Sequence, residues 1–222
     1  MISVHPLWSD EYWPLLLQLY LRKPVGVKPL YAKPTVALAL ELHIEPRCLY
    51  KAMFHLRGLD MPSLRHLWAV YANNPRKLSR DCNRLRHMDG FGKAGEFYEG
   101  VTLNESWEKL FVPIETANDD PPMCIMPVQL IIILDLYFRL TPVTMVAATP
   151  EIIELGKLIR LSAQQVVAIM DVFQFCDPYL NRADFMIDPL LPACMETWQR
   201  YGNDNPEELS AFAAQLKEYF KG

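Results

Sequence analysis

Apolar residues recur along most of the chain at the spacing of helices. The segments 10–23 and 127–140 are apolar at nearly every position, which is typical of helices buried on all sides. Further segments carry apolar residues at three- and four-residue steps, the spacing of helices with one buried face. These segments are Thr35–Leu42, Arg47–Leu56, Glu151–Ile159, Ala163–Phe173 and Glu207–Phe220. The pattern predicts an all-α fold, with Asp10 expected to cap the first helix.

The chain also resembles itself. Residues 15–60 align without gaps on 132–177 at an offset of 117, with seven identities and a shared apolar pattern. A second block, 68–79, aligns on 198–210 and keeps its Trp, Tyr, Asn-Pro and Leu-Ser positions in order. We therefore predict two related modules, 1–88 and 126–222, joined by a connector over 89–125. Phe97, Tyr98 and Val101 lie between turn residues, so the connector is compatible with a short β-hairpin over 96–103.

Within each module the second and third helices are separated by about four residues. A helix-turn-helix needs a small residue in its first helix and apolar residues on both sides of the turn. Module one offers Ala39 and Ile44 for these roles, and module two offers Gly156 and Leu161 at the matching positions. The sequence predicts two tandem helix-turn-helix-like modules. Any three-helix module with a tight corner has the same pattern, so the pattern alone does not establish DNA binding.

Module two resembles the N-terminal helical module of bacterial His-Asn-His (HNH) restriction-type endonucleases. The resemblance rests on LDLYFRL at 134–140, PEIIELGKLI at 150–159, a third helix followed by Asp177-Pro178, and the later Trp198. Module one is similar to a more diverged copy. The resemblance implies a helical accessory module that engages DNA, while the chemistry of such nucleases lies in a separate metal-binding domain.

Two features depart from that family. All five histidines lie before residue 88, within module one, so we expect no His-Asn-His domain. In module two the turn glycine is replaced by Arg160, and the third helix is largely apolar where the family tends to be polar or basic. We therefore expect module two to contact a protein partner or a second copy of the chain.

Charge is distributed unevenly around an overall net charge of −4. Residues 47–93 carry ten bases and three acids, a net +7, whereas 94–222 carry eight bases and nineteen acids, a net −11. A local excess of Arg and Lys is the electrostatic signature of a surface that contacts phosphates. We expect double-stranded DNA to contact the third helix and the basic helix that follows, through Arg47, Lys51, His55, Arg57, Arg76, Lys77, Arg80 and Arg84.

Two interpretations of this basic segment remain open. It either contacts DNA, or it is a solvated face that docks on an acidic surface of the same chain or of a partner. In the second case the chain is a helical interaction scaffold derived from a nuclease accessory domain, without nucleic-acid binding. Exposure of the basic side chains would favour the first interpretation.

Catalytic and metal-binding patterns are weak. Gly90, Gly92 and Gly95 match a phosphate-loop spacing by letter but follow no predicted strand, and the histidines lack metal-ligand spacing. Five cysteines without a C-x-x-C pair favour a reducing, cytoplasmic compartment, with Cys48 and Cys82 beside arginines as the candidates for a reactive thiol. We expect a non-enzymatic protein with no cofactor, no metal site and no membrane span.

Overall fold

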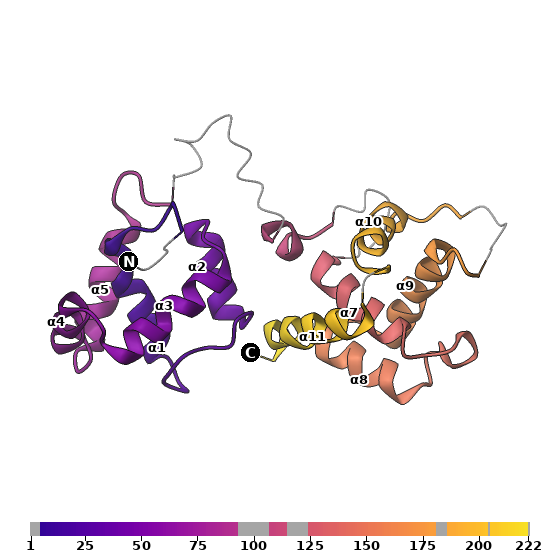
Figure 1. Cartoon of the computed structure of the whole chain (residues 1–222), viewed down its shortest axis with the longest axis horizontal. Coiled ribbons are helices and arrows are strands. Elements are labelled where there is room, and N and C mark those ends of the chain that lie inside the picture. Colours follow the sequence, from indigo (N-terminus) through magenta and orange to yellow (C-terminus); the bar gives the residue numbers. More distant parts are fainter. Residues whose placement is uncertain (1–4, 93–106, 115–123, 181–185, 204, 222) are drawn as a thin grey trace. The chain divides into compact units, whose positions relative to one another are not determined.

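The chain is predominantly helical in the part that the structure describes. The computed structural model describes residues 5–92, 107–114, 124–180, 186–203 and 205–221. The regular elements in these ranges are helices, and the single bridge joins Ile114 to Ile125. The all-α class predicted from the sequence is confirmed, whereas the hairpin expected over 96–103 lies outside the described residues. The chain divides into two compact units, 1–105 and 106–221 (Figure 1).

Unit 1 is organised around its first α-helix. Trp13, Leu15, Leu16, Leu17 and Leu19 of that helix are all buried, and it packs against the third, fourth and fifth helices. Proline occupies the first turn of each α-helix of unit 1, where the missing N–H would have no partner within the helix. The elements are η1 (Asp10–Tyr12), α1 (Trp13–Leu21), α2 (Lys33–Leu42), α3 (Pro46–Gly58), α4 (Pro62–Tyr71) and α5 (Pro75–Arg86).

The start of unit 1 differs from the expected single helix over 10–23. Residues 10–12 form a 3-10 turn, and the side chain of Ser9, not that of Asp10, caps it by accepting a hydrogen bond from the Glu11 amide. Asp10 instead accepts a hydrogen bond from the Trp13 indole at 3.1 Å. Because the Asp10 carboxylate is bound to this ring, it is directed away from the amides it was expected to cap.

Unit 2 encloses an even more apolar helix. Ten of the eleven residues of α7 are buried, and α8, α9, α10 and α11 all contact it. Trp198 of α10 packs against the rings of Tyr137, Phe138 and Phe173 at centroid distances of 5.4 to 6.4 Å. The elements are η2 (Glu108–Phe111), α7 (Pro127–Tyr137), η3 (Pro142–Thr144), α8 (Pro150–Ile159), α9 (Ala163–Cys176), α10 (Leu191–Tyr201), α11 (Pro206–Leu216) and η4 (Lys217–Phe220).

The helices of the two units follow the same order at matching positions. α8 begins and ends 117 residues after α2, and α9 begins 117 residues after α3. Asn74 and Asn205 both cap a helix that starts with proline. The ring of Tyr20 meets Trp68 edge-on at 6.0 Å, and that of Tyr137 meets Trp198 edge-on at 5.7 Å. The correspondence seen in the sequence therefore extends to helix ends and to ring packing.

Both units turn the same corner after the second helix. The corner residue has a left-handed backbone, with φ of 53° at His43 and 62° at Arg160. The next amide donates back to the small residue of the preceding helix, Ile44 to Ala39 at 3.0 Å and Leu161 to Gly156 at 2.9 Å. The third helix then starts within three residues. Glycine normally occupies such a position because a Cβ atom is sterically disfavoured in the left-handed conformation. Both corners nevertheless carry a residue with a side chain.

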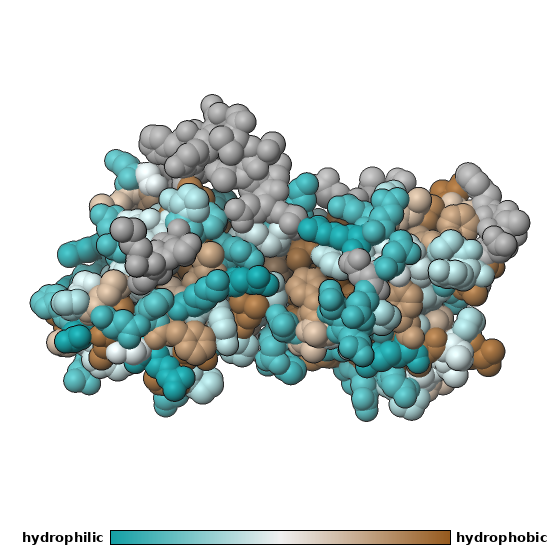
Figure 2. Space-filling model, viewed as in Figure 1, coloured by the Kyte–Doolittle hydropathy of each residue, from teal (hydrophilic) through white to brown (hydrophobic). Residues whose placement is uncertain are grey.

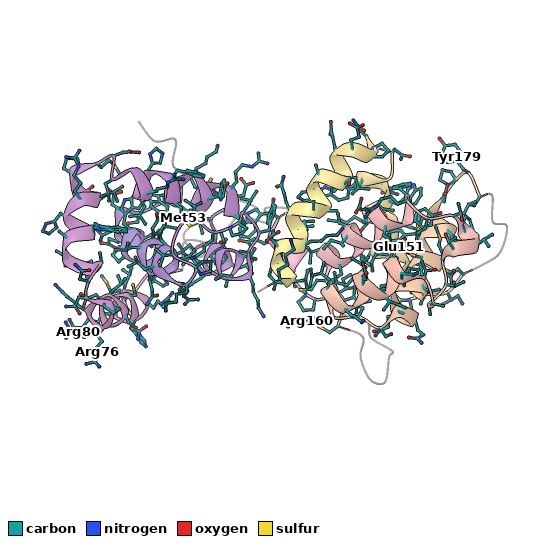
Figure 3. All side chains as sticks on the ribbon, turned by 90° about the horizontal axis from the view of Figure 1, so that it is seen from below. Met53, Arg76, Arg80, Glu151, Arg160 and Tyr179 are labelled. Carbon is teal, nitrogen blue, oxygen red and sulfur yellow. The ribbon has the colours of Figure 1, made fainter. Side chains whose placement is uncertain are left out.

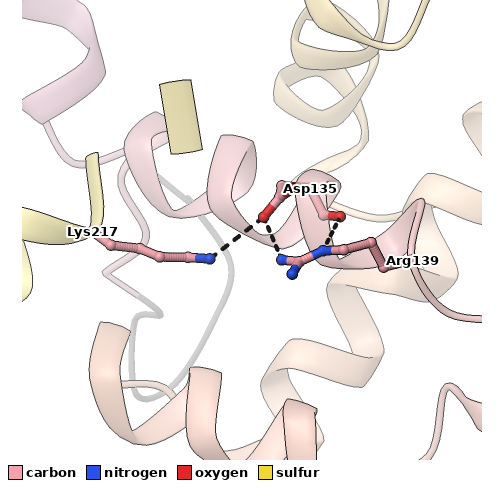
Figure 4. A network of polar contacts seen from close by, with 3 residues as sticks. All are labelled: Asp135, Arg139 and Lys217. Atoms are coloured by element: carbon pink, nitrogen blue, oxygen red, sulfur yellow. Dashed lines mark hydrogen bonds and ion pairs between the residues drawn. The ribbon is translucent and has the colours of Figure 1, made fainter. Parts of the chain in front are cut away.

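A buried carboxylate joins the centre of unit 2 to its last turn (Figure 4). Asp135 on α7 is 4% exposed and accepts hydrogen bonds from the Arg139 guanidinium and from Lys217 Nζ, the latter at 3.4 Å. A buried carboxylate is costly unless it is paired and hydrogen-bonded, and here two cations compensate it. The pair with Lys217 fixes η4 against α7.

Replacing Asp135 tests this network. Asp135→Asn leaves two cations beside a neutral amide, so we expect unfolding in urea to require about 2 kcal/mol less free energy. Glu196→Gln, at an exposed acid of α10, removes the same charge and should stay within about 0.5 kcal/mol of the parent. Equal stability of the two variants would contradict the structural role of Asp135.

The left-handed corner allows a stabilising substitution. Arg160→Gly relieves the steric conflict at φ 62°, and we expect thermal unfolding to shift upward by about 2 °C. Arg160→Ala keeps a Cβ atom and removes the same guanidinium, so it serves as the control and should not raise the melting temperature. A rise of equal size in both variants would assign the effect to charge rather than to the backbone.

Candidate nucleic-acid interface

α3 presents a cationic face opposite its buried face. Leu49, Met53 and Leu56 are fully buried against the core of unit 1. Arg47, Lys51 and Arg57 are exposed, and none of them forms an ion pair with a carboxylate among the described residues. We call these three side chains the α3 cationic face. Its charges are uncompensated within the described part of the chain, so it can attract an anion.

His55, also expected at this interface, is already bound. Its Nδ1 lies 2.9 Å from Oδ2 of Asp60, just beyond the end of α3. Asp60 places a carboxylate beside the last turn of the helix, so His55 adds less to the positive potential than its position in the sequence suggests. Its Nε2 atom remains the one able to contact a ligand.

An aromatic pair on α3 was not expected from the sequence. Phe54 is 44% exposed, and its ring meets that of Tyr50 edge-on with centroids 5.1 Å apart. Phe54 lies one turn after Lys51 and two turns after Arg47 on the helix surface. Apolar residues of an amphipathic helix are normally assigned to the core, which is why Phe54 carried no separate signal.

α5 carries a second set of cations on one long face. Leu78 and Cys82 anchor the helix in the core, and Asn74 caps it by accepting a hydrogen bond from the Lys77 amide at 3.2 Å. Arg76 and Arg80 project outward from unit 1, away from the buried Met53 (Figure 3). The exposed face lines one side of an open hollow and consists of Arg76, Ser79, Arg80, Asn83, Arg84 and His87.

The charge of α5 is partly compensated. Asp81 lies 3.6 Å from Arg80 and 4.0 Å from Arg84, and it accepts a hydrogen bond from the Tyr71 hydroxyl at 3.0 Å. Burial, followed by this hydrogen bond, raises the pKa of Tyr71, so the phenol stays protonated as a donor. Lys77 is half-buried, with its Nζ 5.3 Å from the centre of the Tyr71 ring. Arg76 is the cation of this face with no carboxylate partner among the described residues.

The matching helix of unit 2 has no such surface. The α9 positions equivalent to Arg47 and Lys51 are Gln164 and Ala168, and Asp171 occupies the position of Phe54. Figure 2 shows hydrophilic side chains interspersed with small apolar areas over the visible face of the molecule. The cationic helix face is therefore confined to α3 within the helix pairs α2–α3 and α8–α9.

Each unit also contains a cavity at matching positions. The cavities have volumes of about 100 Å³ in unit 1 and about 250 Å³ in unit 2. Each is lined by the first and second α-helices of its unit and by a basic residue at the end of the last α-helix, Arg86 in unit 1 and Lys217 in unit 2. In unit 1, Arg86 is held by two hydrogen bonds to the Glu41 carboxylate. In unit 2, Lys217 and Arg139 are held by Asp135. The matching pairs are Leu19 and Leu136, Arg22 and Arg139, Leu38 and Leu155, and Arg86 and Lys217.

Neither metal ligation nor a reactive Cys82 finds support in the described residues. No three His, Cys, Asp or Glu side chains among them gather closely enough to hold a metal ion. Cys82 is fully buried, and burial raises its pKa to about 11. Burial likewise raises the pKa of Cys176 to about 11 and that of Cys194 further. These thiols are protonated at neutral pH, whereas Cys124 is exposed.

Thiol labelling tests this ranking. At pH 8 a thiol with a pKa of about 11 is ionised in about one molecule in a thousand, so a disulfide reagent should react rapidly with Cys124 and slowly with Cys82, Cys176 and Cys194. The slow thiols should react about tenfold faster per pH unit as the pH rises. Cys124→Ser should remove one thiol from the fast phase, and rapid reaction of Cys82, Cys176 and Cys194 would contradict the structure.

Comparison with known proteins adds no relative. No protein-family model, no curated protein and no solved structure matches the chain. Among the helices that the structure describes, none is sufficiently long and apolar to cross a lipid bilayer.

Proposed function

We propose that the chain is a non-catalytic DNA-binding or regulatory protein built from two copies of one helix-turn-helix-like module. In this proposal unit 1 binds double-stranded DNA, with α3 entering the major groove. The observation that carries the proposal is the α3 cationic face, whose three cations are exposed and unpaired among the described residues. Unit 2 then serves contact with a protein partner or with a second copy.

The dimensions of α3 suit a major groove. Its thirteen residues span about 20 Å, and a helix with its side chains fits the roughly 12 Å width of the groove. The tight corner at His43 lets α2 brace α3 from one side, as a helix-turn-helix requires. Arg47 and Lys51 in the first half of α3 are then at the end that normally reaches the bases.

α5 supplies contacts of a different kind in this proposal. Arg76 and Arg80 project from unit 1 on long flexible stems, which suits contacts with phosphates rather than with base edges. Lys77 and Arg84 flank them on the same helix. Module one is similar to a diverged copy of the HNH accessory module, and that resemblance supports the same function because it implies an engagement with DNA.

Salt-dependent binding tests the proposal. A labelled duplex of about 25 base pairs, followed by fluorescence anisotropy at two salt concentrations, should bind with an affinity that falls steeply with salt. The double variant Arg47→Ala, Lys51→Ala should weaken binding about tenfold or more at low salt. Because the surface facing the DNA carries two positive charges fewer, the salt slope should also fall, by about 1.8 at most. A pair in α5, Arg76→Ala with Arg80→Ala, should lower the slope without changing any sequence preference.

A matched control separates local contacts from overall charge. Lys157→Ala with Arg200→Ala removes two exposed cations from unit 2, so this variant loses the same net charge as the α3 double variant. Binding should remain close to that of the parent. No binding by the parent at low salt, or equal losses in both double variants, would contradict the assignment of the α3 cationic face.

An interaction scaffold without nucleic-acid binding is the second candidate. It is favoured by large apolar side chains exposed on unit 2, where Val143, Tyr179 and Ile187 are each more than 80% exposed. Isolated exposed apolar residues are common, but several at this level of exposure are typical of contact surfaces. The same anisotropy experiment distinguishes the two candidates, since a scaffold gives no salt-dependent binding of DNA.

A further inference from the structure

Phe54 lies on the outward side of a helix that otherwise presents polar and charged side chains there. Phe54 is 44% exposed, although the buried positions of α3 are filled by Leu49, Met53 and Leu56. Phe54 is therefore not among the buried residues of the core, and a large part of its surface faces solvent. An exposed phenylalanine gives up the free energy that its burial would provide, and a contact on the outer surface would recover it.

The surroundings of Phe54 are those of a fixed contact point. Arg47, Lys51, Phe54 and Gly58 follow one another at steps of four, three and four residues, so they form one stripe along α3. The edge-on contact with Tyr50 restricts the orientation of the ring. Gly58 has no side chain, and the Asp60 carboxylate lies against it, so the stripe ends at a negative charge. Two cations and one apolar ring thus share a narrow, accessible strip.

We propose that Phe54 contacts the 5-methyl group of thymine in the major groove, an inference that rests on the DNA binding proposed above. A phenyl ring has no donor or acceptor with which to read the hydrogen-bonding pattern of a base edge. The thymine methyl is the apolar group that the major groove presents, and phenylalanine is among the side chains that contact it. Arg47 and Lys51 share the stripe with this ring, and their positive charge draws α3 toward the negatively charged groove.

The contact made by Phe54 differs from those made by the cations in how its contribution to affinity depends on salt. Apolar burial releases no counterions, so its contribution to affinity does not change with salt in the way that phosphate contacts do. Phe54→Ala should weaken binding at every salt concentration and leave the salt slope unchanged. The variant with Arg47 and Lys51 replaced should change the slope.

Removal of the methyl group from the DNA provides the test. Two duplexes of one thymine-rich sequence are compared, one with thymine and one with deoxyuridine at every thymine position. The parent protein should bind the deoxyuridine duplex about fourfold more weakly for each methyl group that the ring would otherwise cover. Phe54→Ala should bind both duplexes equally, at about the affinity of the parent for the deoxyuridine duplex. Phe54→Leu keeps an apolar group and should retain part of the discrimination.

The outcomes separate this inference from the function on which it rests. If the parent binds neither duplex, the proposed DNA binding itself is overturned. If the parent binds both duplexes with equal affinity, DNA binding stands and the thymine contact is overturned. Tyr179→Ala removes a highly exposed aromatic ring from unit 2 and should leave discrimination unchanged. A Phe54 effect found with single strands but absent between the two duplexes would indicate stacking on bases, and would also overturn the contact.

Discussion

Enclosure of one apolar helix is the constraint on which each unit depends. A helix that is apolar around its whole circumference has no side that can face water, so other helices must surround it. α7 meets this condition with ten of eleven residues buried, and α1 approaches it with six of nine buried and Pro14, Gln18 and Leu21 half-buried along one side. Each surrounding helix then needs only one apolar face. Its other face is free to carry charge, and this is how α3 can be anchored by Leu49, Met53 and Leu56 while exposing its cations.

The sequence predicted the helices well where periodicity and capping signals agree. α8 was expected at Glu151–Ile159 and spans Pro150–Ile159, because the proline at its start and the apolar steps point to the same bounds. The last helix was expected to continue to Phe220, but its final four residues are a 3-10 turn, a change that periodicity does not detect. Asp135 gave no usable signal, since its partner Lys217 lies 82 residues away along the chain.

At the candidate site, periodicity predicted some features and missed others. It correctly separated the cations of α3 and α5 from the core, but it gave no reason to place Phe54 outside, because a single apolar residue creates no pattern of its own. It also could not show that Asp60 binds His55 or that Arg86 turns inward to Glu41. Such pairings depend on the directions of side chains after the helices have packed.

In the two matching cavities, the base at the end of the last helix pairs with an acid from a different helix. Arg86 pairs with Glu41 of the second helix, and the residue matching Glu41 in unit 2 is Leu158. Lys217 pairs with Asp135 of the first helix, and the residue matching Asp135 in unit 1 is Gln18. A chimera that exchanged second helices would leave Arg86 without an acid, and an exchange of first helices would give it two. Recombination between the two halves would therefore keep both bases paired with one acid each only when all three positions moved together.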